Sequence, residues 1–233
     1  MLISEEGNFI FIHIQKTAGT SLRQFLTREY PDSKELLRQH SGVSEGAGAL
    51  QARWSRYYKF AFVRNPWDRV LSWYSMVMTK DSVESLPFWH MLTNKSQYNI
   101  LWQYLRKNTR DFNDFVETIV DVSLRHPVDM MASRLVLEKR MKSHGDINLF
   151  SQLDCLRDSK GNLGVDYIAK VENIDCEVRN ILNAIGHPNS DSATLSQLNR
   201  SARRPYQEVY TDKTRDIIYE RCKEDIEYFG YEY

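Results

Sequence analysis

The stretch Phe9–Ser21, with the sequence FIFIHIQKTAGTS, decides the fold of this chain. It begins as an apolar run of β-forming residues and continues from Gln15 as a short loop of small and hydroxyl residues. A helical pattern follows, with Leu22, Phe25 and Leu26 on one face. A strand that ends in such a loop and feeds a helix directs backbone N–H groups and the positive end of the helix dipole towards one point. The stretch therefore predicts an anion site, and a phosphate is the ligand that we expect.

The residues of the loop have predicted roles in holding this anion. Lys16 brings a mobile positive charge. The hydroxyl side chains add hydrogen-bond donors, and these are Thr17, Thr20 and Ser21. Gly19, which follows Ala18, lets the backbone approach the ligand closely. The loop differs from the common phosphate loop G-x-x-x-x-G-K-[ST], because Lys16 precedes the glycine. Taken alone, a strand–turn–helix corner with incidental polar side chains is an equally good interpretation.

A second strand–loop–helix pattern follows further along the chain. Residues 57–63, YYKFAFV, favour a strand, and a helix follows the loop RNPWDR up to about residue 80. Asn65 suits the N-cap of this helix. Arg64 stands at the strand end and Ser72 two turns into the helix, so that a guanidinium and a hydroxyl can hold a second phosphate.

These two patterns resemble the cofactor motifs of sulfotransferases that use 3′-phosphoadenosine 5′-phosphosulfate (PAPS). Residues 13–21, HIQKTAGTS, resemble the loop that binds the 5′-phosphosulfate. Residues 62–72, FVRNPWDRVLS, resemble the 3′-phosphate motif, with Arg64 and Ser72 at the spacing found in the family. The variant is the one shared by Golgi glycosaminoglycan sulfotransferases and their bacterial relatives. The resemblance implies a P-loop-like fold in which residues 16–21, Arg64 and Ser72 bind PAPS.

The resemblance also implies roles for two cationic residues. Lys16 would stabilise the charge that develops on the oxygen between phosphate and sulfate as that bond breaks. Arg203, in the basic loop of residues 199–206, would close over the 3′-phosphate of the nucleotide. The alternative for Arg203 is a solvated, charged loop.

His40 is the candidate general base. In the resembled family a histidine falls between the two motifs, and His40 is the one histidine in that interval. An acceptor hydroxyl must lose its proton during transfer, and an imidazole titrates near neutral pH. The alternatives are two nearby carboxylates, Glu35 and Glu45. His13 lies within the first strand, where we expect a hydrogen-bonded core residue rather than a catalyst.

The order of the elements predicts an α/β protein of one domain over residues 1–233. We expect a central parallel sheet of about five strands with helices on both faces, which makes three layers. The strands are expected at residues 8–14, 57–63 and 165–171, and the helices at 20–29, 43–54, about 175–185 and after Thr211. The aromatic-rich residues 83–143 are predicted to form a helical insertion on the acceptor side.

The composition limits the partners of the protein. Lysine and arginine together number 31, as do aspartate and glutamate, so that the formal net charge is zero. The chain therefore has no overall positive charge that would attract nucleic acid or an anionic membrane. The three cysteines are widely spaced without a zinc pattern, which favours free thiols in a reducing compartment. No apolar run has the length of a membrane span or the form of a signal peptide. We expect a soluble, cytoplasmic protein that needs no metal, or a chain trimmed of the membrane anchor that Golgi members carry.

The predicted reaction is transfer of the sulfuryl group from PAPS to an acceptor hydroxyl, leaving 3′,5′-ADP. The resemblance favours a sugar or glycan acceptor, and a small natural product with a hydroxyl or amine is the alternative. Two further alternatives come from other classes of protein. One is a nucleotide kinase, which would need the Walker placement of lysine that this chain lacks. The other is a non-catalytic nucleotide-binding protein. The sequence leaves the oligomeric state open.

Overall fold

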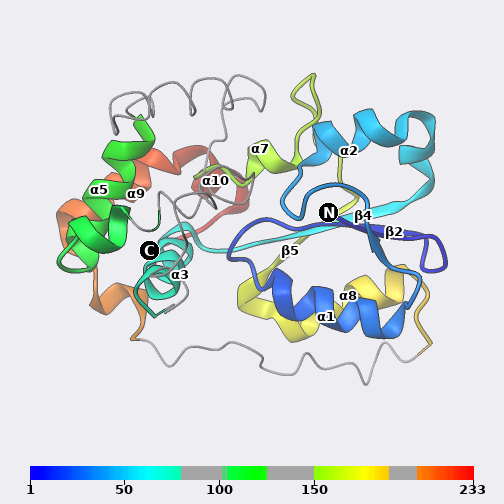
Figure 1. Cartoon of the computed structure of the whole chain (residues 1–233), viewed down its shortest axis with the longest axis horizontal. Coiled ribbons are helices and arrows are strands. Elements are labelled where there is room, and N and C mark those ends of the chain that lie inside the picture. The colour runs from blue at the N-terminus through cyan, green and yellow to red at the C-terminus, as the bar shows by residue number, and fades with distance from the viewer. Residues whose placement is uncertain (80–101, 103, 125–149, 189–203) are drawn as a thin grey trace, which may run out of the picture. The chain divides into compact units, whose positions relative to one another are not determined.

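The computed structural model describes residues 1–79, 102, 104–124, 150–188 and 204–233 (Figure 1). These residues fall into two compact units. The first comprises the described residues up to Asn65 together with those from Ser151 to 188, and the second comprises the other described residues. That residues 1–233 form a single domain stays a prediction.

The first unit is built on a five-stranded sheet with the order β3-β1-β2-β4-β5. Its strands are β1 (Leu2–Ser4), β2 (Phe9–Ile12), β3 (Lys34–Glu35), β4 (Tyr58–Val63) and β5 (Tyr167–Lys170). β4 pairs in parallel with both β2 and β5, as predicted. β1 pairs antiparallel with both β2 and β3, so that the sheet is mixed and the prediction of a purely parallel sheet is wrong.

One carboxylate binds the end of β1 and the turn that follows it. Asp32 accepts a hydrogen bond from Ser4 Oγ at 2.7 Å and others from the backbone N–H groups of Glu5 and Glu6 at 2.7 and 3.0 Å. These bonds satisfy the donors of the turn between β1 and β2. A strand of three residues shows no periodicity of its own, and for this reason the sequence analysis missed it.

Helices flank the sheet of the first unit (Figure 1). Helices α1 (Gly19–Glu29) and α8 (Ile174–Ala184) cover one face, and α2 (Val43–Leu50) and α7 (Leu153–Leu156) lie on the other. Side chains of β2 alternate between the two faces. One continuous core cluster joins α1 and α8 to the sheet, and it contains Phe9, Phe11, Leu22, Phe25, Leu26, Phe60, Phe62, Val178, Ile181 and Leu182. The predicted α/β class, with helices flanking a five-stranded sheet, is confirmed.

The second unit is helical among its described residues. Its helices are α3 (Pro66–Thr79), α5 (Phe112–Leu124), α9 (Asp212–Arg221) and α10 (Lys223–Phe229), and α5 packs against α3 and α9. The Oγ1 of Thr211 accepts from the N–H of Thr214 at 3.3 Å and caps α9, as predicted. Of the predicted helical insertion, α5 is confirmed, and residues 83–101, 103 and 125–143 lie outside the described residues.

A buried arginine of the second motif organises this second unit. Nη1 of Arg69 donates to the carbonyl oxygen of Phe150 at 3.0 Å, and its guanidinium lies 4.5 Å from the ring centroid of Trp73. The indole nitrogen of Trp67 donates to the carbonyl oxygen of Arg215 at 3.0 Å. These contacts hold α3 against its neighbours, so that Trp67 and Arg69 have a structural role.

Candidate cofactor and catalytic site

The loop between β2 and α1 has the backbone of an anion site. Lys16 and Ala18 have positive φ values of 66° and 57°, whereas Thr17 between them does not. Alternation of this kind turns successive backbone N–H groups to one side and forms a nest for an anion. Ala18, the N-cap of α1, makes no side-chain cap, and the first turn of α1 contains no acidic residue. The positive helix end is therefore suited to a negative ligand.

The hydroxyl side chains of the loop differ in their surroundings. Thr17 is fully buried, and its Oγ1 donates to the carbonyl oxygen of Ile14 at 2.9 Å. Its hydroxyl proton is therefore used in a hydrogen bond within the loop. Thr20 is exposed and Ser21 is half-buried in the first turn of α1. Lys16 is also half-buried. That these residues bind PAPS stays a prediction, with Thr20 and Ser21 better placed than Thr17 to offer a hydroxyl proton.

Gly19 packs against a histidine ring. A Cβ atom at Gly19 would lie 1.9 Å from both Cδ2 and Nε2 of His13, much closer than any real contact. The φ of Gly19 is not positive, so that the glycine is required here by space and not by backbone conformation. That Gly19 also lets a ligand approach stays a prediction.

His13 is a buried, neutral imidazole. Its ring is stacked on that of Phe11 with a centroid separation of 5.6 Å. Burial, helped by the nearby His40, lowers the pKa of His13 to about 3. Its Nδ1 is 3.2 Å from Nε2 of Gln39, and since an amide nitrogen only donates, the proton of His13 is on Nε2. The expectation of a hydrogen-bonded core histidine is confirmed.

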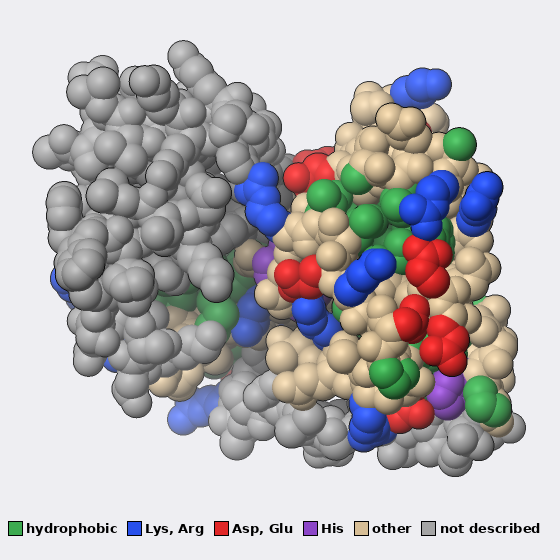
Figure 2. Space-filling model, turned by 45° about the vertical axis from the view of Figure 1, so that its right-hand side comes forward, with side chains coloured by type: hydrophobic (Ala, Val, Ile, Leu, Met, Phe, Trp, Pro, Cys, Tyr) green, Lys and Arg blue, Asp and Glu red, His purple; other side chains and the backbone are tan. Residues whose placement is uncertain are grey.

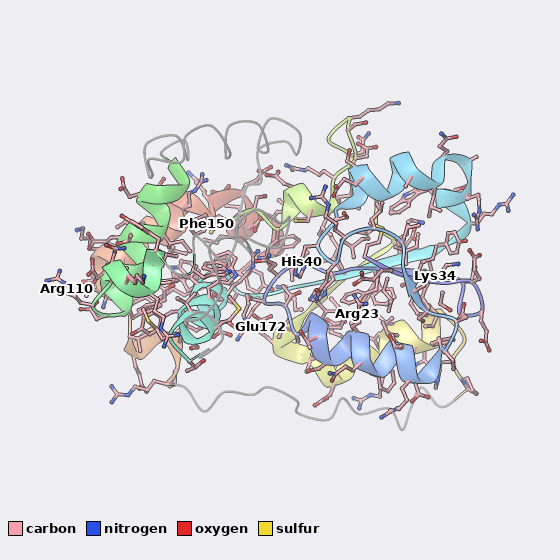
Figure 3. All side chains as sticks on the ribbon, in the orientation of Figure 1. Arg23, Lys34, His40, Arg110, Phe150 and Glu172 are labelled. Carbon is pink, nitrogen blue, oxygen red and sulfur yellow. The ribbon has the colours of Figure 1, made fainter. Side chains whose placement is uncertain are left out.

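His40 lies in the turn before α2, against the same strand end (Figure 3). Its Nδ1 is 2.8 Å from the backbone oxygen of His13, so that Nδ1 carries the proton and the lone pair is on Nε2. The two imidazole rings meet edge to face, with centroids 4.6 Å apart. A neutral imidazole in this tautomer is the form that accepts a proton from an alcohol.

The two alternative carboxylates are engaged elsewhere. Glu35 forms an ion pair with Arg23 at 2.6 Å. Oε2 of Glu45 accepts a hydrogen bond from the N–H of Gly42 at 3.1 Å, at the start of α2. The assignment of the base to His40 stays a prediction, and the geometry favours it over these two.

Arg64 connects the two motif loops within the first unit. Its Nη1 donates to the carbonyl oxygen of Lys16 at 3.1 Å. Its backbone is held by the buried amide of Gln152, which accepts from the N–H of Arg64 and donates to its carbonyl, both at 2.9 Å. The guanidinium therefore reaches the anion loop from the carboxyl end of β4, the edge of the sheet at which α/β proteins bind ligands.

A comparison of the whole sequence with known protein families agrees with the interpretation of these two loops. A family model described as "Sulfotransferase family" matches residues 1–232. The chain belongs to the sulfotransferase family. It is a transferase of sulfuryl groups, and the predicted membership of the sulfotransferase family is confirmed. A search of curated proteins gave no significant match.

Two predicted ligands of this sulfotransferase lie outside the described part of the first unit. Ser72 lies on α3 in the second unit, where its side chain is buried. Arg203 lies outside the described residues, next to the exposed Arg204. The role of both at a 3′-phosphate stays a prediction.

Three amide or carboxylate side chains to which the sequence analysis gave no role hold residues of the candidate site. Gln39 fixes the tautomer of His13, and Gln152 fixes the backbone of Arg64. Glu172, two residues after the end of β5, accepts from the N–H of Asn65 at 2.7 Å (Figure 3). The position of Glu172 at a strand end was a usable signal, because three parallel strands end at this edge. Gln39 and Gln152 carried no signal, since their partners lie far away in sequence.

Three features of the described residues concern metal ions, membranes and disulfides. Within them, no three His, Cys, Asp or Glu side chains gather into a group that could hold a metal ion. None of the described helices is both long enough and apolar enough to cross a membrane. All three cysteines, Cys155, Cys176 and Cys222, are free thiols.

Proposed function

We propose that this sulfotransferase moves the sulfuryl group of PAPS to a hydroxyl group of a sugar or glycan and releases 3′,5′-ADP. The observation that carries the proposal is the hydrogen bond from Arg64 to the carbonyl oxygen of Lys16 at 3.1 Å. It couples an anion nest at the end of β2 to a guanidinium at the end of β4. PAPS carries anionic groups on both the 5′ and the 3′ side of its ribose, and two linked anion sites suit such a molecule.

The nest residues and the start of α1 fit the phosphosulfate end. Backbone N–H groups of the nest and the hydroxyls of Thr20 and Ser21 would bind its oxygens. The ammonium of Lys16 would neutralise the negative charge on the oxygen that leaves sulfur. Arg64, with Ser72 and Arg203, would bind the 3′-phosphate.

His40 would take the proton of the acceptor. The acceptor oxygen forms a bond to sulfur while the bond from sulfur to the bridging oxygen breaks, and Nε2 of His40 receives the hydroxyl proton. The imidazolium that forms is stabilised, because its Nδ1–H already donates to the backbone oxygen of His13 at 2.8 Å. His13 stays neutral because burial holds its pKa at about 3, so that it adds no repelling charge. Positioning and charge neutralisation would supply most of the rate.

We also propose that the enzyme works in the cytoplasm without a metal. The free state of all three thiols supports a reducing compartment. Fractionation of cells that produce the protein would test the location, and activity after treatment with a chelator would test the metal.

The test of the function is incubation of the purified protein with sulfur-labelled PAPS and a panel of sugars, glycans and small alcohols. We expect label in a sugar-containing product and stoichiometric release of 3′,5′-ADP. In parallel, 3′,5′-ADP should raise the melting temperature more than ATP does. A protein stabilised by ATP that transfers no label would be a kinase, and one stabilised by nucleotide without any transfer would be a binding protein.

A further inference from the structure

The ring of His13 presents a hydrogen-bond donor to the start of α1. His13 follows β2 directly, and it is only 5% exposed. Since side chains alternate along a strand, it lies on the same face as Phe9 and Phe11, the face that α1 covers (Figure 1). The edge of the ring that bears Cδ2 and Nε2 faces Gly19, because a Cβ atom there would lie 1.9 Å from both of these atoms and 2.7 Å from Cε1. Gly19 is the first residue of α1, so that the Nε2–H group lies at the N-terminus of this helix.

The Nε2–H group is open to an acceptor from outside the chain. Nδ1 of the same ring is occupied by Gln39 at 3.2 Å, and none of the described residues accepts the proton of Nε2. Within the described part of the chain, the fully buried side-chain atoms without a partner are Oγ of Ser33, Nε1 of Trp73 and Nε of Arg221. Nε2 of His13 is not one of these atoms and therefore keeps accessible surface. A donor of this kind, in a side chain that is otherwise buried, calls for a partner such as a ligand.

The surroundings of this donor suit an anion. The nest at Lys16 and Ala18 directly precedes it, and the first turn of α1 contains no acidic residue. Figure 2 shows basic and acidic side chains side by side on the visible face of the molecule, so that this acid-free helix start differs from the mixed surface. The first N–H groups of a helix have no intrahelical acceptor and share a positive dipole end. The imidazole N–H therefore adds a side-chain donor to a group of backbone donors.

Gln39 decides which nitrogen of His13 donates. An amide nitrogen donates and does not accept, so that the lone pair of Nδ1 faces Gln39 and the proton is on Nε2. Burial, helped by His40 and Arg23, lowers the pKa of His13 to about 3, and the ring stays neutral at working pH. Neutral imidazoles of lowered pKa serve in enzymes as hydrogen-bond donors to charge that develops on a substrate. The ring is thus prepared to donate a hydrogen bond without giving up its proton.

We propose that Nε2–H of His13 donates a hydrogen bond to an oxygen of the 5′-phosphate of PAPS, and that Gln39 is the positioning residue that holds this tautomer. The inference rests on the proposed function, to which it adds a binding residue outside the loop of residues 16–21. No proton leaves His13 during the transfer. As the bond from sulfur to the bridging oxygen breaks, negative charge spreads over the phosphate, and a donor already in place stabilises that charge. Because 3′,5′-ADP keeps the 5′-phosphate, the contact should persist in the product complex.

The test measures binding without catalysis. The probes are 3′,5′-ADP, adenosine 3′-phosphate, which lacks the 5′-phosphate, and inorganic pyrophosphate, which lacks the nucleoside. The matched variants are His13→Gln and His13→Met. Both remove the ring and have similar lengths, but only glutamine brings an amide N–H to the region of Nε2. Gln39→Leu leaves the ring in place and removes the group that fixes its tautomer. Calorimetry gives the affinities, and the ¹⁵N resonances of labelled histidine give the tautomer.

We expect His13→Met to bind 3′,5′-ADP at least about tenfold more weakly than the unmodified protein, as fits the loss of a hydrogen bond to a charged group. His13→Gln should recover most of this loss. Adenosine 3′-phosphate should bind the unmodified protein and both His13 variants equally. The ¹⁵N resonances should place the proton on Nε2 in the free protein and in the complex with 3′,5′-ADP. Gln39→Leu should show both tautomers and a smaller loss of affinity than His13→Met.

Equal affinities of His13→Gln and His13→Met for 3′,5′-ADP would overturn the inference. A proton on Nδ1 would do the same, and since this is measured on the unmodified protein, the test stands even if a variant fails to fold. The proposed function fails separately. A protein that does not bind 3′,5′-ADP, but whose affinity for pyrophosphate falls in His13→Met and returns in His13→Gln, would refute the function and retain the contact. Failure to bind any of the three probes would refute both.

Discussion

Nδ1 of His40 lies 2.8 Å from the backbone oxygen of His13, and this contact fixes which nitrogen of His40 can act as a base. The carbonyl accepts the proton of Nδ1, and Nε2 therefore carries the lone pair. Because the carbonyl belongs to the residue after β2, His40, the proposed base, is attached to the strand end from which the proposed anion loop starts.

Replacement of His40 by alanine removes the proposed base. We expect turnover to fall about 10²–10⁴-fold and the acidic limb of the pH–rate profile, which reports the base, to flatten. A phenol acceptor should partly restore the rate, because its hydroxyl loses a proton more easily than that of an alcohol. Turnover against pH with an alcohol and a phenol of similar shape is the measurement. An unchanged acidic limb would move the assignment to Glu35 or Glu45.

Replacement of Lys16 by alanine should cost about 10²–10³-fold in turnover, the loss typical of one charge-stabilising donor. The loss should be the same across the working pH range, since lysine stays protonated there, and a phenol should not restore the rate. Both lysine and alanine meet the same backbone strain at the positive φ of 66°, so that the comparison isolates the ammonium. A pH-dependent loss would argue that Lys16 acts on the nucleophile.

Replacement of Arg64 by alanine should weaken binding of 3′,5′-ADP by more than about tenfold, the value of a charge-assisted contact of roughly 1.5–3 kcal/mol. Binding of 5′-AMP, which lacks the 3′-phosphate, should change much less. The KM for PAPS should rise more than turnover falls, because the 3′-phosphate is remote from sulfur. Ser72→Ala is the companion variant. If calorimetry shows equal losses of affinity for 3′,5′-ADP and 5′-AMP, Arg64 does not bind the 3′-phosphate.

Replacement of Gly19 by alanine should destabilise the protein through its clash with His13. A Cβ atom would lie 1.9 Å from the ring, and forced overpacking costs about 1–3 kcal/mol. In the double variant His13→Ala with Gly19→Ala, the second substitution should cost nothing further, because the ring is gone and alanine favours helix. Urea unfolding of the two single variants and the double variant gives the coupling. Additive losses would contradict the contact.

The buried His13 should make stability depend on pH. Its pKa is about 3 in the folded protein and 6.5 as the ordinary value, so that the unfolded chain binds more protons between these limits. Stability should therefore decrease as pH falls from about 6.5 towards 3, by roughly 5 kcal/mol at most. Urea unfolding from pH 4 to 8 measures the slope. His13→Asn should have a shallower slope through this window, and an identical slope would mean that other groups cause it.

The sequence by itself determined the local elements of the site. The apolar run, the loop and the helical spacing of Leu22, Phe25 and Leu26 are patterns of neighbouring residues, and they predicted β2, the turn that follows it and α1 correctly. The same holds for β4 and α3, and for the order of the two motifs that identified the family. The histidine at position 40 could be proposed as the base from its place between the motifs.

Only the tertiary structure decided what holds these parts together. The contacts between Arg64 and Gln152 and between Asn65 and Glu172 join residues 88 and 107 positions apart. No local period encodes such pairs, because they arise when a helix or loop packs against a strand end from elsewhere in the chain. Packing likewise decides three other features. These are the antiparallel pairing of β1, the space that Gly19 leaves for the ring of His13, and the tautomer of His40. Local periodicity therefore indicates where along the chain the candidate residues stand. Long-range packing fixes the geometry of the loop between β2 and α1 and of His40.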